Sequence, residues 1–237
     1  MALKKDPKQI QEMFSRIAPG YDRLNHILSL RKDFKWRAFA AEKIKHLAPK
    51  NPPFILDACT GTADLAVTVA RHNPSYAIIG IDYSERMLRI ARRKIERLDV
   101  RGRIFLVRAD LTRLPLKNSA CAASTVAFGI RNLEEPRKGI SEMRRITARN
   151  GVTAILEFTN PKNRLMNRLY YIYLTKILPV LGNFLSGSKA YSYLSNSILA
   201  FSTEQELVNM LSKSGYGRTR IFDLDFDIVK LIVGFKM

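Results

Sequence analysis

Residues 54–82 read FILDACTGTADLAVTVARHNPSYAIIGID, and this stretch decides the fold. Its first part, FILD (54–57), is a short apolar run typical of a buried strand, and YAIIGID (76–82) is a second one. Between them, residues 63–72 carry the apolar spacing of a helix, which ends at HNP (72–74). A strand, a helix and a second strand in this order predict a βαβ unit with parallel strands.

The same alternation continues through the rest of the chain. The pattern predicts five further strands, at residues 103–110, 122–128, 152–158, 217–223 and 227–236. It predicts further helices at 84–98, where Ser84 is a good N-cap, at 134–148, and after an N-cap at Ser202 or Thr203. LDFD (224–227) is a tight turn between the last two strands. The expected fold is α/β, a doubly wound and mostly parallel seven-stranded sheet with an antiparallel C-terminal hairpin.

The length of 237 residues suits a single domain, residues 1–237, with four parts. These are an N-terminal helical cap (8–48), a core (54–160), a helical lid or insert (161–201), and a C-terminal helix and hairpin (202–237). The insert contains LMNRLYYIYLTKILPVLGNFL, in which polar residues and a proline interrupt the apolar run. This sequence suits a core helix, an interfacial helix or a lid over an apolar ligand better than a membrane span.

The few cysteines and histidines indicate a chain without a structural metal or disulfide framework. Two cysteines, Cys59 and Cys121, and three scattered histidines lack metal-ligand spacing. The N-terminus is basic but has no apolar signal-peptide core. We therefore expect a cytoplasmic protein in a reducing compartment.

The net charge of +19 is spread over the whole chain. It amounts to +7 in residues 1–50, +7 in 51–157 and +5 in 158–237, so it does not belong to a tail. Such a surface favours polyanions, either nucleic acid or an anionic membrane. The arginines alternate with helix faces and do not gather with aromatic residues, which makes nucleic acid the less favoured partner.

Three aspartates stand at the ends of successive predicted strands, where doubly wound sheets bind ligands. Asp57 ends the first strand, Asp82 the second and Asp110 the third; Asp82 follows Gly61 by 21 residues, the offset at which a carboxylate accepts ribose hydroxyls. The turn after Asp57 lacks both G-x-G-x-x-G and GK[ST], and its acidic residues do not suit a diphosphate. S-adenosylmethionine, which has no phosphate and carries sulfonium and ammonium groups, fits better.

Four segments, LDACTGTADLA, GIDYSERML, RADLTRLP and AFGIRNLEEP, resemble motifs of class I methyltransferases in order and spacing. With MFSRIAPGYDRLNHILSL, the chain more narrowly resembles the ubiquinone/menaquinone biosynthesis C-methyltransferases, the UbiE/MenG family. The resemblance implies a Rossmann-like fold and cofactor contacts from Thr62, Asp82, Asp110 and Leu111. Ala127 stands against the cofactor where family members often have a serine.

The resemblance implies a polyprenylated quinol as the substrate, and we favour demethylmenaquinol because the chain is short. Arg131 in FGIRN follows the fourth strand, near the expected position of the transferred methyl group. Because arginine is a poor base, we expect it to stabilise a phenolate or to orient a water. Asn132 could hold a quinol oxygen, and Tyr21 in APGYDRLN could complete the network. No metal is needed, and a lipid-borne substrate together with the basic surface predicts peripheral, salt-sensitive membrane association.

Three alternatives remain open at this point. The substrate could be 2-methoxy-6-polyprenyl-1,4-benzoquinol, or the basic surface could mark an RNA methyltransferase or another nucleic-acid-binding protein. The chain could also bind a quinone or lipid without being an enzyme. The sequence also leaves open whether the chain is a monomer or a homodimer. The loop departs from the family pattern at Cys59 and Ala63. If Ala63 has a positive φ, it stores strain of order 1 kcal/mol, and glycine there should tighten cofactor binding.

Overall fold

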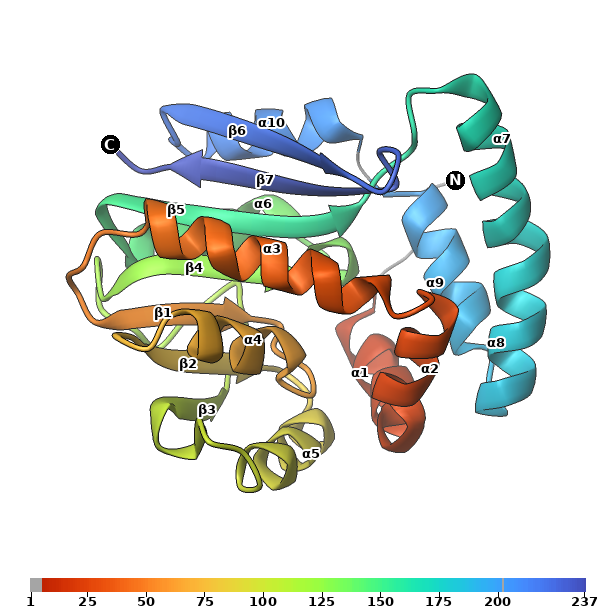
Figure 1. Ribbon diagram of the computed structural model, residues 1–237, viewed down its shortest axis with the longest axis horizontal. Coiled ribbons are helices and arrows are strands. Elements are labelled where there is room, and N and C mark those ends of the chain that lie inside the picture. Colours follow the sequence, from red (N-terminus) through yellow and green to blue (C-terminus); the bar gives the residue numbers. More distant parts are fainter. Residues whose placement is uncertain (1–5, 202) are drawn as a thin grey trace.

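A seven-stranded sheet forms the centre of the computed structural model, which describes residues 6–201 and 203–237 (Figure 1). The strand order is β3-β2-β1-β4-β5-β7-β6, in which β1 to β5 are parallel and β7 runs antiparallel to both β5 and β6. The strands are β1 Phe54–Ala58, β2 Ala77–Asp82, β3 Ile104–Arg108, β4 Cys121–Ala127, β5 Thr147–Phe158, β6 Arg218–Leu224 and β7 Val229–Phe235. The predicted doubly wound sheet and its C-terminal hairpin are confirmed.

Helices cover both faces of this sheet. On one face lie α3 (Lys32–Leu47), α4 (Asp64–His72) and α5 (Glu85–Ile95), and on the other α6 (Pro136–Ile146) and α10 (Glu204–Lys213). Successive side chains of a strand point to opposite faces, so Ile55 packs in the first core and Leu56 in the second. Both side chains are fully buried.

Local signals explain where two of these helices begin. Ser84 is the N-cap of α5, because its Oγ accepts a hydrogen bond from the Met87 N–H. Thr203 caps α10 in a capping box with Glu206. Thr203 is thus one of the two predicted caps, and Ser202 lies outside the described residues.

The structure divides the predicted N-terminal helical cap into separate helices and corrects the start of one strand. The N-terminal cap is three helices, α1 (Pro7–Ile17), α2 (Tyr21–Leu28) and α3, separated by the 3-10 turn Ala18–Gly20 and by a left-handed bend at Leu30 and Arg31. β5 begins at Thr147, five residues before its predicted start. A bulge with Asn150 at φ 61 interrupts the strand there, and a side chain at Gly151 would meet the Ala122 carbonyl oxygen at 2.4 Å.

The insert packs against the N-terminal cap beside the carboxyl ends of the strands. It comprises α7 (Arg164–Ile172), a π-helical stretch Tyr173–Ile177, α8 (Leu178–Ser186) and α9 (Ala190–Leu199). Leu24 of the cap shares a third apolar cluster with side chains of these helices. Figure 1 shows α7 leading into α8 along one side of the molecule, with α9 beside them. Within the described part of the chain, no helix has both the length and the apolar character to cross a bilayer.

Candidate active site

A cavity of about 670 Å³ opens at the carboxyl ends of β1, β4 and β5. Asp57, Ala127 and Phe158 line it from these three strands. Side chains of α1, α2 and α7 to α9 form the rest of its wall. Most of the lining is apolar, as expected for a pocket that holds an apolar ligand. The cavity therefore lies where a doubly wound sheet binds its ligands.

The turn from β1 into α4 is wound through left-handed backbone. Cys59, Gly61 and Ala63 have φ of 51°, 56° and 69°. The Gly61 N–H donates to Asp82 Oδ2 at 2.9 Å, and the Ala63 N–H donates to the Thr60 carbonyl at 2.8 Å. Only one of the three left-handed positions is the glycine that such angles favour. The condition set for strain at Ala63, a positive φ, is met.

A buried carboxylate, Asp57, and a half-buried one, Asp82, flank this turn. Asp57 is 1% exposed and accepts a hydrogen bond from Thr60 Oγ1 at 2.6 Å, and burial raises its pKa to about 7. Burial also raises the pKa of Asp82, although the N–H groups of Gly61 and Ser84 hydrogen-bond its carboxylate. Desolvated carboxylates gain from a nearby positive charge, so both groups suit a cationic ligand.

The structure divides the predicted cofactor residues into two groups. Lining the cavity are Asp57, Gly61, Thr62 and Ala127. Outside the lining are Asp82, Asp110 and Leu111. Asp110 is exposed, and its Oδ1 accepts bonds from Thr112, whereas the Leu111 side chain is buried in the core and leaves only backbone atoms for a ligand.

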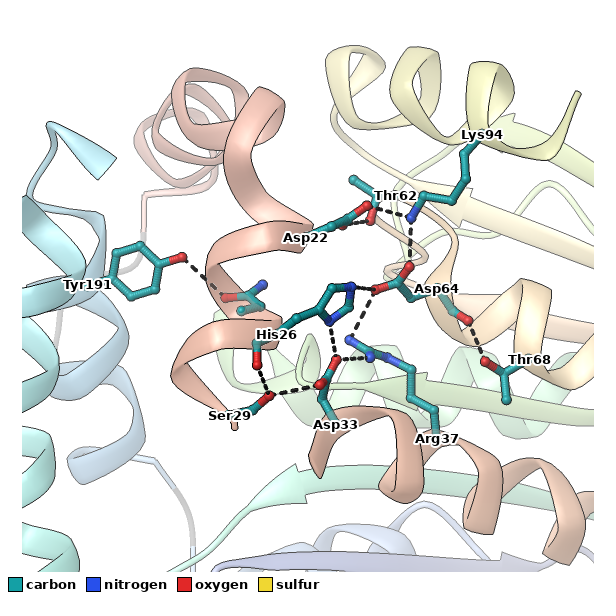
Figure 2. A network of polar contacts seen from close by, with 11 residues as sticks. Asp22, His26, Ser29, Asp33, Arg37, Thr62, Asp64, Thr68, Lys94 and Tyr191 are labelled. Carbon is teal, nitrogen blue, oxygen red and sulfur yellow. Dashed lines mark hydrogen bonds and ion pairs between the residues drawn. The ribbon is translucent and has the colours of Figure 1, made fainter. Parts of the chain in front are cut away.

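Thr62 connects the turn to the N-terminal cap. Its Oγ1 donates to Asp22 of α2, and Lys94 of α5 contacts Asp22 and Asp64 at 2.6 Å each (Figure 2). The predicted cofactor contact of the Thr62 side chain therefore competes with a bond inside the protein. This bond couples α2 to the turn that would hold the cofactor.

A second part of the network surrounds His26. Its Nδ1 lies 2.6 Å from Asp33 Oδ2, and its Nε2 lies 3.8 Å from Asp64 Oδ2 (Figure 2). The nitrogen and oxygen atoms with which these three residues could hold a metal ion lie within 4.8 Å of one another. Their spacing in the sequence did not indicate this proximity. Arg37 bonds to Asp33 and lies 3.4 Å from Asp64, so a guanidinium supplies positive charge to this cluster. His26 belongs to α2, Asp33 and Arg37 to α3, and Asp64 to α4. The cluster therefore holds α2 and α3 against the start of α4, beside the cavity.

Arg131 lies in the wall of the cavity and is 3% exposed. Its Nη1 donates to Glu157 Oε1 at 2.7 Å and to the Phe128 carbonyl, and its Nε donates to Ser197 Oγ at 3.3 Å. Nη2 has no hydrogen-bond partner in the described part of the protein and is the nitrogen left for a ligand. Arg131 is thus both fixed by a buried carboxylate and placed in the cavity wall.

The other two predicted catalytic residues have different surroundings. Tyr21 lines the cavity; burial raises the pKa of its hydroxyl, and the nearby Arg131 opposes that rise. Asn132 does not line the cavity, and its Oδ1 accepts a bond from the Tyr193 hydroxyl at 3.2 Å. Tyr193 does line it, so the structure brings Arg131 and Tyr21 to one cavity and places Asn132 behind Tyr193.

Two residues of this region were missed by the sequence interpretation. Glu157 is fully buried on β5, and burial raises its pKa against the charge of Arg131. An acidic residue within the apolar run VTAILEF was the signal that could have identified it, since a buried charge needs a partner. Tyr170 of α7 is also buried and lines the cavity; it lies in the insert that the sequence offered as a lid over an apolar ligand, but no local pattern distinguished it from its neighbours.

Solved structures share this fold at low sequence identity. A putative S-adenosylmethionine-dependent methyltransferase from Methanococcus maripaludis superposes with a TM-score of 0.62 at 18% identity, covering 90% of this chain and 92% of that one. A methyltransferase from Thermotoga maritima, described as a possible histamine N-methyltransferase, gives a TM-score of 0.62 at 19% identity over 95% and 99% of the two chains. These similarities establish the class I methyltransferase fold.

Sequence relatives are more specific. The chain is 37% identical over 235 residues to the ubiquinone/menaquinone biosynthesis C-methyltransferase UbiE of Geotalea uraniireducens, which covers 99% of both chains. It is 38% identical over 233 residues to a demethylmenaquinone methyltransferase of Bacteroides fragilis, over 98% of this chain and 94% of the relative. The sequence profile of the ubiE/COQ5 methyltransferase family matches residues 1–236. The chain therefore belongs to the ubiE/COQ5 methyltransferase family.

Proposed function

We propose that this protein is a demethylmenaquinone methyltransferase, which methylates a ring carbon of a polyprenylated quinol with S-adenosylmethionine. The observation that carries the proposal is one apolar cavity whose wall contains both the Gly61–Thr62 turn and the buried Arg131. The names of the relatives from Geotalea and Bacteroides support the same reaction.

The residues around the turn fit S-adenosylmethionine. Asp57 and Asp82 are desolvated carboxylates that complement its cationic groups, and Asp82 lies at the strand end expected for the ribose. The Ala109 N–H donates to the Asp82 carbonyl at 3.1 Å, which places the Asp110 segment next to the Asp82 strand end and suits an adenine contact. When bound, S-adenosylmethionine supplies the methyl group and the sulfonium leaving group.

The protein would then act by positioning and by electrostatics. One quinol hydroxyl loses its proton to water, and Arg131 stabilises the resulting phenolate, which raises electron density at the attacking carbon. As the new carbon–carbon bond forms, the bond between the methyl group and sulfur breaks, and loss of the ring proton to water restores aromaticity. Glu157 holds the guanidinium in place, and Tyr21 lies in the same wall. Holding carbon and methyl at attacking distance supplies much of the rate.

The substrate's prenyl tail and the charge of +19 both suit a protein that works at an anionic membrane surface. The apolar lining favours a prenyl chain over a nucleotide, so an RNA substrate is not proposed. Sedimentation of the purified chain determines whether it is a monomer or a homodimer.

The test compares substrates. Purified protein is incubated with labelled S-adenosylmethionine and either reduced demethylmenaquinol or reduced 2-methoxy-6-polyprenyl-1,4-benzoquinol, each beside its oxidised form. We expect one added methyl group in the naphthoquinol and none in either quinone, because only the reduced ring is nucleophilic. Preferential methylation of the benzoquinol would reassign the substrate, and methylation of RNA alone would overturn the proposal.

A further inference from the structure

The outward side of α7 and α8 carries large apolar side chains in contact with solvent. Leu165 and Val180 are each 68% exposed and Phe184 is 84% exposed. Six more exposed apolar residues lie on the same two helices and the π-helical stretch between them, namely Leu169, Tyr171, Ile172, Ile177, Leu181 and Leu185. We call this set the insert face. Such a continuous apolar surface indicates an interaction site.

The charge around the insert face has one sign. Residues 159–203 contain five lysines and arginines and not a single aspartate or glutamate. Arg164, Arg168 and Lys176 come from α7 and the π-helical stretch themselves. An apolar helix surface whose own charged residues are all cations is the pattern of helices that lie in the interface of an anionic bilayer.

The cavity opens through the insert face. Leu169, Ile177, Leu181 and Leu185 belong to this face and also line the cavity. Leu30, after α2, is 79% exposed and also lines the cavity. An apolar ligand can therefore pass from the insert face into the cavity along apolar side chains.

We propose that the insert face docks on an anionic lipid bilayer, with Phe184 and Val180 among the acyl chains and the cavity open to them. The prenyl tail then enters the cavity from the bilayer without crossing water. This inference rests on the proposed function for the identity of the tail. The docking itself is measured without cofactor or substrate, so its failure is distinct from a failure of methyl transfer.

Vesicle binding of matched variants tests the docking. Phe184→Glu is compared with Phe105→Glu, which changes a 53% exposed phenylalanine on edge strand β3, away from α7 and α8 (Figure 1). Phosphatidylglycerol vesicles are used at a salt concentration where half of the parent protein binds, and phosphatidylcholine vesicles serve as the uncharged comparison. We expect Phe184→Glu to lower the partition coefficient at least tenfold and Phe105→Glu to change it less than twofold.

Other outcomes overturn the docking proposal. Equal losses in the two variants would mean that binding follows total charge and not the insert face. If Phe184→Glu instead converts a dimer to a monomer in sedimentation and leaves vesicle binding unchanged, a second copy of the chain occupies this face. Activity on a short-chain quinol in solution should be unchanged in Phe184→Glu, since Phe184 does not line the cavity.

A separate observation concerns a hydroxyl inside the cavity. Tyr170 is 6% exposed and lines the cavity, and its hydroxyl has no hydrogen-bond partner among the residues that the structure describes. Burial raises its pKa, so the hydroxyl stays neutral, and Arg131 is close enough to oppose that rise. A buried unpaired hydroxyl is costly unless a ligand completes it.

We infer that Tyr170 is a substrate-binding residue whose hydroxyl hydrogen-bonds a ring oxygen of the quinol beside Arg131. This assignment also rests on the proposed function, so the parent protein must first turn the quinol over. Tyr170→Phe keeps the ring and removes the hydroxyl. We expect kcat/KM for the quinol to fall about tenfold, with cofactor affinity unchanged and thermal stability equal or higher.

Tyr173→Phe is the matched control, because its hydroxyl donates to the Leu28 carbonyl at 2.8 Å. That variant should lose thermal stability. If Tyr170→Phe gains stability while kcat/KM stays within twofold of the parent, the hydroxyl is only an unsatisfied group and the assignment is wrong.

Discussion

Ala63 is the residue at which the structure allows a backbone effect to be measured most cleanly. It has φ 69°, is fully buried, and serves as the N-cap position of α4. Its N–H bonds the Thr60 carbonyl at 2.8 Å, and its carbonyl accepts from the Val67 N–H at 2.9 Å, so the turn holds this conformation. A left-handed alanine costs about 1–2 kcal/mol, and glycine does not carry this cost.

Two other contributions to the free energy of unfolding make Ala63→Gly less favourable. Glycine gives the unfolded chain more conformational freedom, which costs about 0.4–1 kcal/mol, and the lost methyl group costs about 0.8 kcal/mol. Ala66→Gly is the matched control, because Ala66 is also fully buried but lies in the first turn of α4, after the left-handed position. Ala66→Gly has the same entropic cost and loses the same methyl group, but it relieves no backbone strain. We therefore predict that Ala63→Gly has nearly the stability of the parent and exceeds Ala66→Gly by about 1–2 kcal/mol.

Chemical unfolding of the two variants measures this difference directly. For a chain of 237 residues it corresponds to roughly 2–8 °C in Tm. Calorimetric titration adds the cofactor readout, in which Ala63→Gly should bind S-adenosylmethionine more tightly than the parent. If the two substitutions lower the free energy of unfolding by the same amount, Ala63 is not strained in the folded protein, and the reasoning from its φ is refuted.

Three further predictions concern the charged residues of the site. Arg131→Met combined with Glu157→Gln removes the guanidinium without leaving a buried charge. In this double variant kcat should fall about 10²–10³-fold while the cofactor dissociation constant changes less than threefold. If kcat and cofactor affinity fell by the same factor, the pair would be structural. Asp82→Asn should weaken cofactor binding at least tenfold in titration calorimetry, because the carboxylate is the expected ribose acceptor, and unchanged affinity would contradict this. Burial raises the pKa of Asp57 to about 7, above its unfolded value of 3.8, so the folded state holds more protons in this range and loses stability as pH rises from about 4 to 7. Between pH 5 and pH 8, Asp57→Asn should gain about 3 kcal/mol relative to the parent in urea unfolding, and parallel curves would refute the shift.

The fold could be predicted from sequence because its signals are local. Apolar runs marked the strands, and Ser84 and Thr203 marked helix starts that the structure confirms. The bulge before Gly151 was missed, because it depends on the approach of the Ala122 carbonyl from a neighbouring strand. Local patterns do not contain that contact.

The site was predicted only in part, for the same reason. Strand ends located Asp57 and Asp82, but side-chain partners come from distant segments. Glu157 follows Arg131 by 26 residues, and Asp22 precedes Thr62 by 40. Asn132 follows Arg131 directly, yet it does not line the cavity and bonds the cavity-lining Tyr193, a partner 61 residues later. Such pairings depend on how the insert and the cap pack over the sheet.

Transfer of a labelled methyl group to reduced demethylmenaquinol in phosphatidylglycerol vesicles tests the central claim most directly. The purified protein should produce menaquinol that carries the label on the ring carbon, and the oxidised quinone should remain unlabelled. A protein that binds S-adenosylmethionine but labels none of the reduced quinols would contradict the account.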